Sequence, residues 1–189
     1  AAERIAEEIR RAGGEAIAVA VDVRRKADFE RALSDTLKAF GQLDCVLNGA
    51  GINAPTPFFD ISVEEWRDML DVQLTGTLLS CQVFGRHMVG QKHGSIINIS
   101  SVAGVYPYPG GNAYGGSKAF VSQFSLGLRS DLHGTGVRVT TIEPGMAETE
   151  FTLVRTHGDQ AASDKLYTGA NPMTADDIAE SIFYVATLP

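Results

Sequence analysis

The sequence has few of the residues from which disulfide frameworks and metal centres are built. Its 189 residues include two cysteines, Cys45 and Cys81, which are far apart and form no CxxC pair. The four histidines do not stand at the spacing of metal ligands. We therefore predict neither a disulfide framework nor a metal site, and we expect both cysteines to be buried thiols.

Positive charge and long apolar runs are also scarce. The chain has 16 lysines and arginines against 23 aspartates and glutamates, a net charge of -7 and a pI near 5.0. No basic patch is present to neutralise phosphates, which argues against nucleic acid or a membrane as a partner. No apolar run approaches the ~20 residues of a membrane span. No signal sequence opens the chain, so we expect a cytoplasmic protein.

The composition, 44% hydrophobic and 21% charged, suits one globular domain spanning residues 1–189. Segments with helical periodicity alternate with short apolar runs, which is typical of an α/β protein. This alternation predicts a doubly wound, Rossmann-like parallel sheet with helices on both faces. The expected helices are 1–12, 26–40, 62–89, 112–133 and 174–188, and the expected strands are 16–21, 43–47, 95–99 and 137–142.

Two of these segments have further local features. Ser62 and Glu65 form a capping-box pattern at the start of the long helix, which we expect to bend near residues 71–76. Residues 146–172 are polar and rich in glycine, alanine and aspartate, so we expect an irregular segment that serves as a substrate lid.

Three side chains in residues 95–118 carry the chemistry. Tyr114 and Lys118 are four residues apart, so they share one face of the helix expected there. At ~4 Å and an effective dielectric constant of about 20, an ammonium stabilises a phenolate by at most about 4 kcal/mol, which lowers the tyrosine pKa. Ser101, just past the preceding strand, is able to donate a hydrogen bond to a substrate oxygen. The three groups together suit hydride transfer between a carbinol and a carbonyl.

Other unusual residues fall at the carboxyl ends of the expected strands, where parallel sheets bind ligands. They are Asp22, residues 48–51 with the sequence NGAG, Ser100 with Ser101, and residues 143–145 with the sequence EPG.

The order ISS, a gap of thirteen positions from Ser101 to Tyr114, then YGGSK resembles the short-chain dehydrogenase/reductase family. The resemblance implies an NADP or NAD cofactor and a small-molecule substrate. It implies that Tyr114 is the catalytic acid and base, that Ser101 orients the substrate oxygen, and that Lys118 holds the nicotinamide ribose and lowers the Tyr114 pKa. It also implies a homo-tetramer assembled through the helices at 62–89 and 112–133.

The same resemblance implies a set of cofactor-binding residues along the sheet edge. NGAG is similar to the family's Asn-Asn-Ala-Gly, in which glycine and alanine leave room for the adenosine half of the cofactor. The cofactor-binding residues implied are Asp22, Val23, Asn48, Gly49, Ala50, Gly51, Tyr114, Lys118, Pro144, Gly145 and Thr149.

The chain departs from the family pattern in two ways. Gln73 stands in DVQLTG where the family has an asparagine that holds a water in its proton relay, and we expect this change to impair the relay without abolishing it. Nothing before Ala1 supplies the family's first two strands and phosphate-binding turn, and the last strand is also missing. We therefore expect these 189 residues to belong to a longer polypeptide.

Residues 95–189 most resemble the NADP-dependent 3-hydroxy acid dehydrogenases that oxidise serine and allo-threonine. Arg155 is then a candidate partner of a substrate carboxylate through a bidentate hydrogen bond. Two alternatives stay open. One is a broader ketoreductase, including a 3-oxoacyl reductase, and the other is a catalytically silent nucleotide-binding or interaction module.

Overall fold

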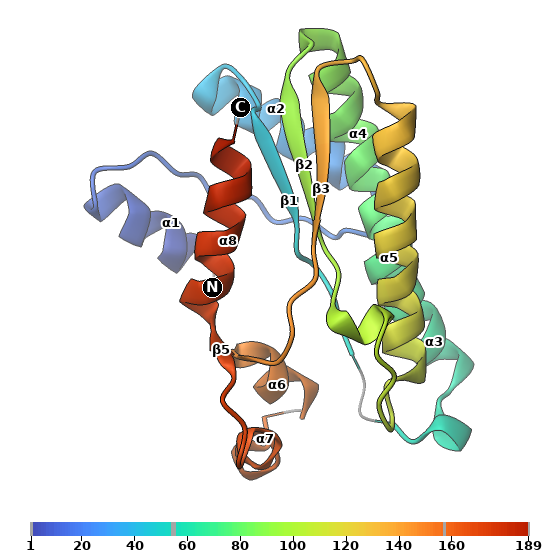
Figure 1. Ribbon diagram of the computed structural model, residues 1–189. Coiled ribbons are helices and arrows are strands. Elements are labelled where there is room, and N and C mark those ends of the chain that lie inside the picture. The colour runs from blue at the N-terminus through green and yellow to red at the C-terminus, as the bar shows by residue number, and fades with distance from the viewer. Residues whose placement is uncertain (1, 54–55, 157, 189) are drawn as a thin grey trace.

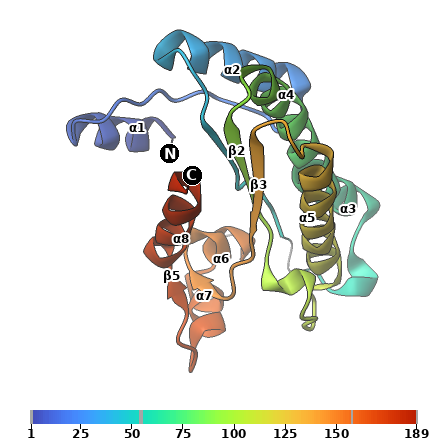
Figure 2. The same cartoon turned by 45° about the horizontal axis from the view of Figure 1, so that its top comes forward.

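The computed structural model describes residues 2–53, 56–156 and 158–188. Its centre is a parallel sheet with the strand order β1 (Cys45–Asn48), β2 (Gly94–Ile99) and β3 (Val137–Ile142). Helices α4 and α5 cover one face of this sheet, and α8 lies against the other (Figures 1 and 2). The larger helices are α1 (Ala2–Arg11), α2 (Lys26–Phe40), α4 (Gly76–Gln91), α5 (Asn112–Asp131) and α8 (Ala175–Thr187). The predicted α/β fold with a parallel sheet is confirmed.

The expectation of a strand at residues 16–21 is wrong. The segment has no regular structure, and β1 pairs with β2 alone. A strand requires a neighbouring strand to accept its backbone hydrogen bonds, and no described segment pairs with this one. Side chains bind part of its backbone instead: Arg10 donates to the Ala16 carbonyl at 2.8 Å and Arg31 to the Ala20 carbonyl at 2.6 Å.

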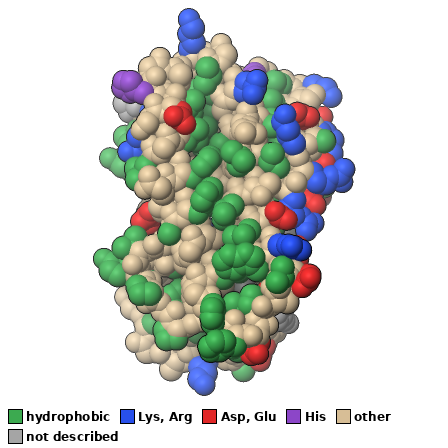
Figure 3. All heavy atoms as spheres, turned by 90° about the vertical axis from the view of Figure 1, so that its right-hand side faces the viewer, with side chains coloured by type: hydrophobic (Ala, Val, Ile, Leu, Met, Phe, Trp, Pro, Cys, Tyr) green, Lys and Arg blue, Asp and Glu red, His purple; other side chains and the backbone are tan. Residues whose placement is uncertain are grey.

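The outer surface of α4 and α5 faces the viewer in Figure 3, where hydrophobic side chains extend along the middle of the molecule. Leu78 of α4 and Phe120 and Leu126 of α5 are exposed. Phe120 stacks on Phe124 with 5.7 Å between the ring centres. An apolar surface of this kind on two neighbouring helices is compatible with a contact to another protein.

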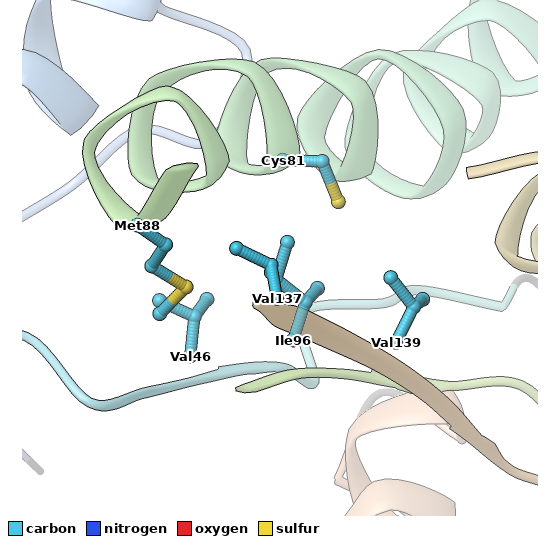
Figure 4. Packing of buried hydrophobic residues seen from close by; sticks show 6 residues of the cluster. All are labelled: Val46, Cys81, Met88, Ile96, Val137 and Val139. Carbon is cyan, nitrogen blue, oxygen red and sulfur yellow. The ribbon is translucent and has the colours of Figure 1, made fainter. Parts of the chain in front are cut away.

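The main hydrophobic core lies between α4 and the sheet (Figure 4). The register pairs Val46 with Ile96 and Ile96 with Val139, so these side chains form one row across the three strands. Cys81 and Met88 of α4 point down onto this row (Figure 4). Each large aliphatic side chain buried here contributes roughly 1.5 to 3 kcal/mol. Cys81 is a buried thiol as expected.

The other cysteine corrects our expectation. Cys45 is exposed, because it begins β1 at the edge of the described sheet.

The long helix is bent where the sequence predicts. It consists of α3 (Val63–Leu70), a π-helical turn at Asp71–Thr75 and α4. Ser62 caps α3 by accepting the Glu65 N–H at 3.0 Å. The second half of the expected capping box is absent among the described hydrogen bonds, because the Glu65 carboxylate accepts from the Thr56 hydroxyl at 2.6 Å instead.

The expectation of an irregular segment at residues 146–172 is also wrong. Thr149 and Asp159 cap two short helices with their side chains. Thr174 and Asp177 form a complete capping box at the start of α8, as the predicted helix start requires. The added elements are β4 (Ala147–Glu148), α6 (Glu150–Arg155), α7 (Gln160–Tyr167) and β5 (Met173–Thr174), with β4 parallel to β5.

Candidate active site

The loop that carries Ser101 packs directly against the first turns of α5. It contains a short 3-10 turn, Val102–Gly104, and a Cβ atom at Gly104 would lie 2.8 Å from the Ala119 nitrogen. A Cβ at Gly115 would lie 2.7 Å from the Ala103 oxygen. Both distances are too short for any residue with a side chain. The two glycines therefore allow the contact that places the Ser101 loop beside α5.

The structure brings the three predicted catalytic side chains together at the carboxyl end of β2. Lys118 Nζ lies 5.6 Å from the centre of the Tyr114 ring and donates to the Ile99 carbonyl oxygen at 2.9 Å. Ser101 Oγ donates to the Pro144 carbonyl oxygen at 3.4 Å and accepts the Ala103 N–H at 3.1 Å. One helix and two strand ends therefore position the serine, the phenol and the amine.

Burial dominates the protonation of the phenol and the amine. It raises the pKa of Tyr114 above its ordinary value, and the nearby Ser101 hydroxyl and Arg155 guanidinium oppose this only in part. Burial also lowers the pKa of Lys118 to about 8. The expected lowering of the Tyr114 pKa is therefore not found in this structure, because burial of the phenol outweighs the groups that stabilise the phenolate. Tyr114 is a neutral phenol at neutral pH.

A chain of hydrogen bonds ties α5 to the end of β3 behind the lysine. Ser100 Oγ donates to the Lys118 carbonyl oxygen at 2.7 Å and lies 2.8 Å from Ser122 Oγ. Ser122 Oγ donates to the Glu143 carboxylate at 2.5 Å. The sequence drew attention to Ser100 and Glu143 as strand-end residues, but Ser122 gave no signal because isolated helical serines are common.

Gln73 is buried in the π-helical turn, with 1% of its surface exposed. Its Nε2 donates to the Ile52 carbonyl oxygen at 3.0 Å, and its Oε1 has no partner among the described residues. A Cβ at Gly51 would lie 3.5 Å from this oxygen and 3.6 Å from Lys118 Nζ. The amide oxygen and the ammonium therefore flank the same glycine.

A cavity of about 440 Å³ adjoins the catalytic groups. It reaches Gly51 on the Lys118 side and Phe151 on the other, where the Phe151 and Tyr114 ring centres are 6.1 Å apart. Arg155 lines it, as a residue that binds substrate would. Three further polar residues that the sequence did not identify as site residues, Asn53, Glu65 and Asp68, also line it.

The predicted cofactor-binding residues lie in three groups. Asn48, Gly49, Ala50 and Val23 line a second hollow of about 230 Å³ between β1 and the segment before α2. Among the described residues, the one atom within 4 Å of a Cβ at Gly49 would be Cγ1 of Ile99, at 4.0 Å, so this glycine borders open space. Gly51 lines the catalytic cavity instead, and a Cβ at this glycine would lie 3.6 Å from Lys118 Nζ.

Asp22, Pro144 and Thr149 are each engaged in local contacts. Both Asp22 oxygens accept from Arg24 at 2.9 Å, and this pairing lowers the Asp22 pKa to about 2. The Asp22 carboxylate keeps acceptor capacity beyond its bonds to Arg24, so it is able to contact adenine while it is paired. The Pro144 carbonyl accepts the Val102 N–H at 3.1 Å, and Thr149 Oγ1 caps α6. Gly145 packs near Met173.

The residues fit the nicotinamide half of a dinucleotide. The buried and unpartnered Gln73 oxygen, the side-chain-free surface at Gly49 and Gly51, and the Lys118 ammonium provide polar groups and close access at one strand edge. This is the edge at which doubly wound sheets bind nucleotides. The arrangement is that of a nicotinamide-dependent oxidoreductase.

The chain belongs to the short-chain dehydrogenase family, whose model matches residues 1–159 under the description short chain dehydrogenase. Serine 3-dehydrogenase of Agrobacterium fabrum is 52% identical over 174 residues, covering 90% of this chain and 69% of that protein. Sulfoacetaldehyde reductase 2 of Chromohalobacter salexigens is 48% identical over 171 residues, covering 89% of this chain and 68% of that protein.

A solved structure, the closed form of a serine dehydrogenase complexed with NADP+, superimposes on the chain with a TM-score of 0.90. The two are 41% identical, and the superposition covers 99% of this chain and 77% of the other. The predicted family, its α/β architecture and its resemblance to dehydrogenases of 3-hydroxy acids are confirmed.

Membrane-spanning helices and clustered metal ligands are both absent from the part of the chain that the structure describes. None of its helices combines the length and the apolar character needed to cross a bilayer. The same residues contain no group of three histidine, cysteine, aspartate or glutamate side chains arranged to bind a metal ion.

Proposed function

We propose that the chain is an NADP-dependent oxidoreductase that interconverts a short 3-hydroxy acid, such as serine or allo-threonine, and its carbonyl form. The observation that carries this proposal is the cavity that has Arg155 on its wall and the Tyr114 ring at its side. A guanidinium binds a carboxylate through two parallel hydrogen bonds, and a phenol exchanges a proton with a substrate oxygen. The serine dehydrogenase relatives support the same substrate class.

Each side chain has a role that follows from its surroundings. When bound, the cofactor supplies or accepts the hydride at the carbinol carbon. Tyr114 donates a proton to the carbonyl oxygen in the reducing direction, for which its raised pKa keeps it in the acid form. Ser101 orients that oxygen with its hydroxyl. Lys118 uses one N–H on the Ile99 carbonyl, and its remaining donors would hold the nicotinamide ribose.

The remaining predicted residues would hold the cofactor along the strand edge. Asn48, Gly49 and Ala50 would contact the adenosine half, together with Asp22 and Val23. Pro144, Gly145 and Thr149 would line the nicotinamide. Residues 146–172, which include α6 and α7, would act as the substrate lid, because α6 carries both Phe151 and Arg155 into the cavity wall.

Gln73 would occupy the position of the relay residue. Its unpartnered Oε1 lies beside Gly51, close to the buried ammonium, so it retains an acceptor for a proton path. Its extra methylene shifts that acceptor relative to an asparagine. We infer a relay that functions more slowly than one based on asparagine.

A second candidate function is the reduction of a short sulfonated aldehyde. The relative named sulfoacetaldehyde reductase 2 is 48% identical to the chain, and a sulfonate would bind Arg155 as a carboxylate does. A ketoreductase for neutral substrates has less support, because the cavity is lined by three charged side chains. The exposed apolar surface of α4 and α5 supports a homo-tetramer, while the cytoplasmic location stays a prediction.

The test is an absorbance assay of nicotinamide reduction by the full-length protein. L-Serine, 3-hydroxypropionate, isethionate and a neutral alcohol such as 1-propanol would each be offered with NADP and with NAD. With NADP, we expect turnover of the three compounds that carry a carboxylate or a sulfonate and none of the neutral alcohol. Activity toward the neutral alcohol alone, or toward none of the four compounds, would contradict the proposal.

A further inference from the structure

The catalytic cavity contains more negative charge than a simple hydroxy acid requires. Arg155 is the one cation among its lining residues, whereas Glu65 and Asp68 supply two carboxylates. A substrate with only a carboxylate would be attracted by the arginine and repelled by these acidic groups. A substrate that also carries an ammonium would be attracted by both charges.

Glu65 is the better placed of the two acids. It is half-buried, and one carboxylate oxygen accepts from Thr56 at 2.6 Å. Glu65 forms no salt bridge within the described residues. Asp68 is exposed and already has a cation 3.6 Å away, Arg24 Nη1. A partly buried carboxylate without a neighbouring cation is energetically unfavourable. A ligand that brings a cation relieves this cost.

A second polar group in the lining of the same cavity lacks a partner among the described residues. Asn53 Nδ2 is buried and has no hydrogen-bond partner among the described residues. A buried donor without an acceptor costs about 1 to 3 kcal/mol unless a ligand supplies one. Asn53 and Arg155 line the same cavity, and the Arg155 guanidinium has paired donors that suit a carboxylate. Together with Glu65 and Tyr114, they correspond to the three polar groups of a 2-amino-3-hydroxy acid.

We propose that Glu65 binds the substrate ammonium, while Arg155 and Asn53 bind the carboxylate, so that the cavity recognises the zwitterion of an amino acid with a hydroxyl at C3. This inference rests on the proposed function and narrows its substrate class. Glu65 is then a residue that determines specificity and takes no part in proton transfer. Substrates that lack the ammonium, such as 3-hydroxypropionate and isethionate, are the disfavoured members of the class.

The test uses two measurements on the wild type, Glu65→Gln and Glu64→Gln. The first is the dissociation constant of L-serine for the complex of the protein with NADPH, followed by NADPH fluorescence, in which no turnover occurs. The second is kcat/KM for L-serine and for 3-hydroxypropionate. Glutamine retains the acceptor for Thr56, and Glu64 is an exposed neighbour that does not line the cavity.

We expect Glu65→Gln to weaken L-serine binding and to lower its kcat/KM by about 10- to 100-fold, the range of a charge-assisted hydrogen bond. The values for 3-hydroxypropionate should stay within about twofold or improve, and Glu64→Gln should change neither substrate. Equal effects on both substrates, or no effect on serine, would overturn the inference and leave the proposed function intact. Glu65-dependent serine binding without any oxidation would support the inference and contradict the proposed function.

Discussion

Lys118 Nζ donates a 2.9 Å hydrogen bond to the Ile99 carbonyl oxygen while lying 5.6 Å from the centre of the Tyr114 ring. The lysine side chain crosses from α5 to the end of β2, and 5% of its surface is exposed. A backbone acceptor thus fixes the position of the amine, and burial lowers its pKa to about 8. The burial that positions the Lys118 amine for a cofactor also makes the charged form of this amine unfavourable.

The buried amine gives the free energy of unfolding a specific pH dependence. The Lys118 pKa is about 8 in the folded chain against 10.5 for the free side chain, so the unfolded chain binds more protons between these values. Wild-type stability should therefore gain from this group as pH rises through that window. Lys118→Met removes the effect.

We expect the stability advantage of Lys118→Met over the wild type to shrink by roughly 2 kcal/mol between pH 8 and pH 10, measured by urea unfolding. Lys38→Met, on the exposed surface of α2, is the control and should show no such trend. If the difference in stability between Lys118→Met and the wild type did not vary with pH, burial would impose no free energy penalty on the charged form of Lys118.

Gln73→Asn tests the proposed relay. The substitution removes one methylene and moves the amide oxygen, which now has no partner among the described residues. We expect the turnover number to rise by about threefold or more, a small part of the roughly 10²- to 10⁴-fold that positioned proton transfer supplies. Gln73→Met, of similar length but without the amide, should lower it. Should the asparagine variant turn over at the wild-type rate, the relay argument fails.

Arg155→Lys tests the carboxylate site. Lysine retains the charge but loses the paired hydrogen bonds of the guanidinium. The Michaelis constant for L-serine should rise about 10- to 100-fold with a small change in kcat, because binding rather than chemistry is affected. A neutral alcohol, if it is a substrate at all, should be unaffected. An equal rise for charged and neutral substrates would remove Arg155 from the site.

Substitution of Asn98 tests the buried hydrogen-bond network beneath the carboxyl edge of the sheet. Asn98 is fully buried, accepts from Asn48 Nδ2 at 2.8 Å and donates to Ser125 Oγ at 2.8 Å. Asn98→Ala removes the acceptor of Asn48 Nδ2 and the donor to Ser125 Oγ at a fully buried position, and it should cost about 2 to 4 kcal/mol of unfolding free energy in urea. Ser130→Ala, on the exposed end of α5, should cost little. Equal losses in the two variants would show that the buried network adds nothing.

The sequence predicts most of this fold because helices and buried strands have local periodicity. The bend after Leu70 and the caps at Ser62 and Thr174 follow from residues close together in the chain. The strand at residues 16–21 does not follow, because a strand exists only where a distant segment pairs with it. The exposure of Cys45 is missed for the same reason, since it depends on the edge of the sheet.

The site is predictable in its residue types and less so in its electrostatics. The spacing of Tyr114 and Lys118 indicates their shared face, but their pKa shifts depend on burial by segments far away in the sequence. The role inferred for Glu65 depends on Thr56, which diverts its carboxylate from the helix cap. The sequence gives no reason to select Asn53 and Phe151, because only the structure shows that both line the same cavity.

Proton transfer by Tyr114 is the claim on which the enzymatic account depends, and Tyr114→Phe tests it most directly. The measurement is kcat for NADPH-dependent reduction of the aldehyde formed from the preferred substrate, together with the dissociation constant of NADPH. The account predicts a fall in kcat of about 10²- to 10⁴-fold with NADPH binding unchanged, because only the acid is lost. A kcat within about twofold of the wild type would contradict it.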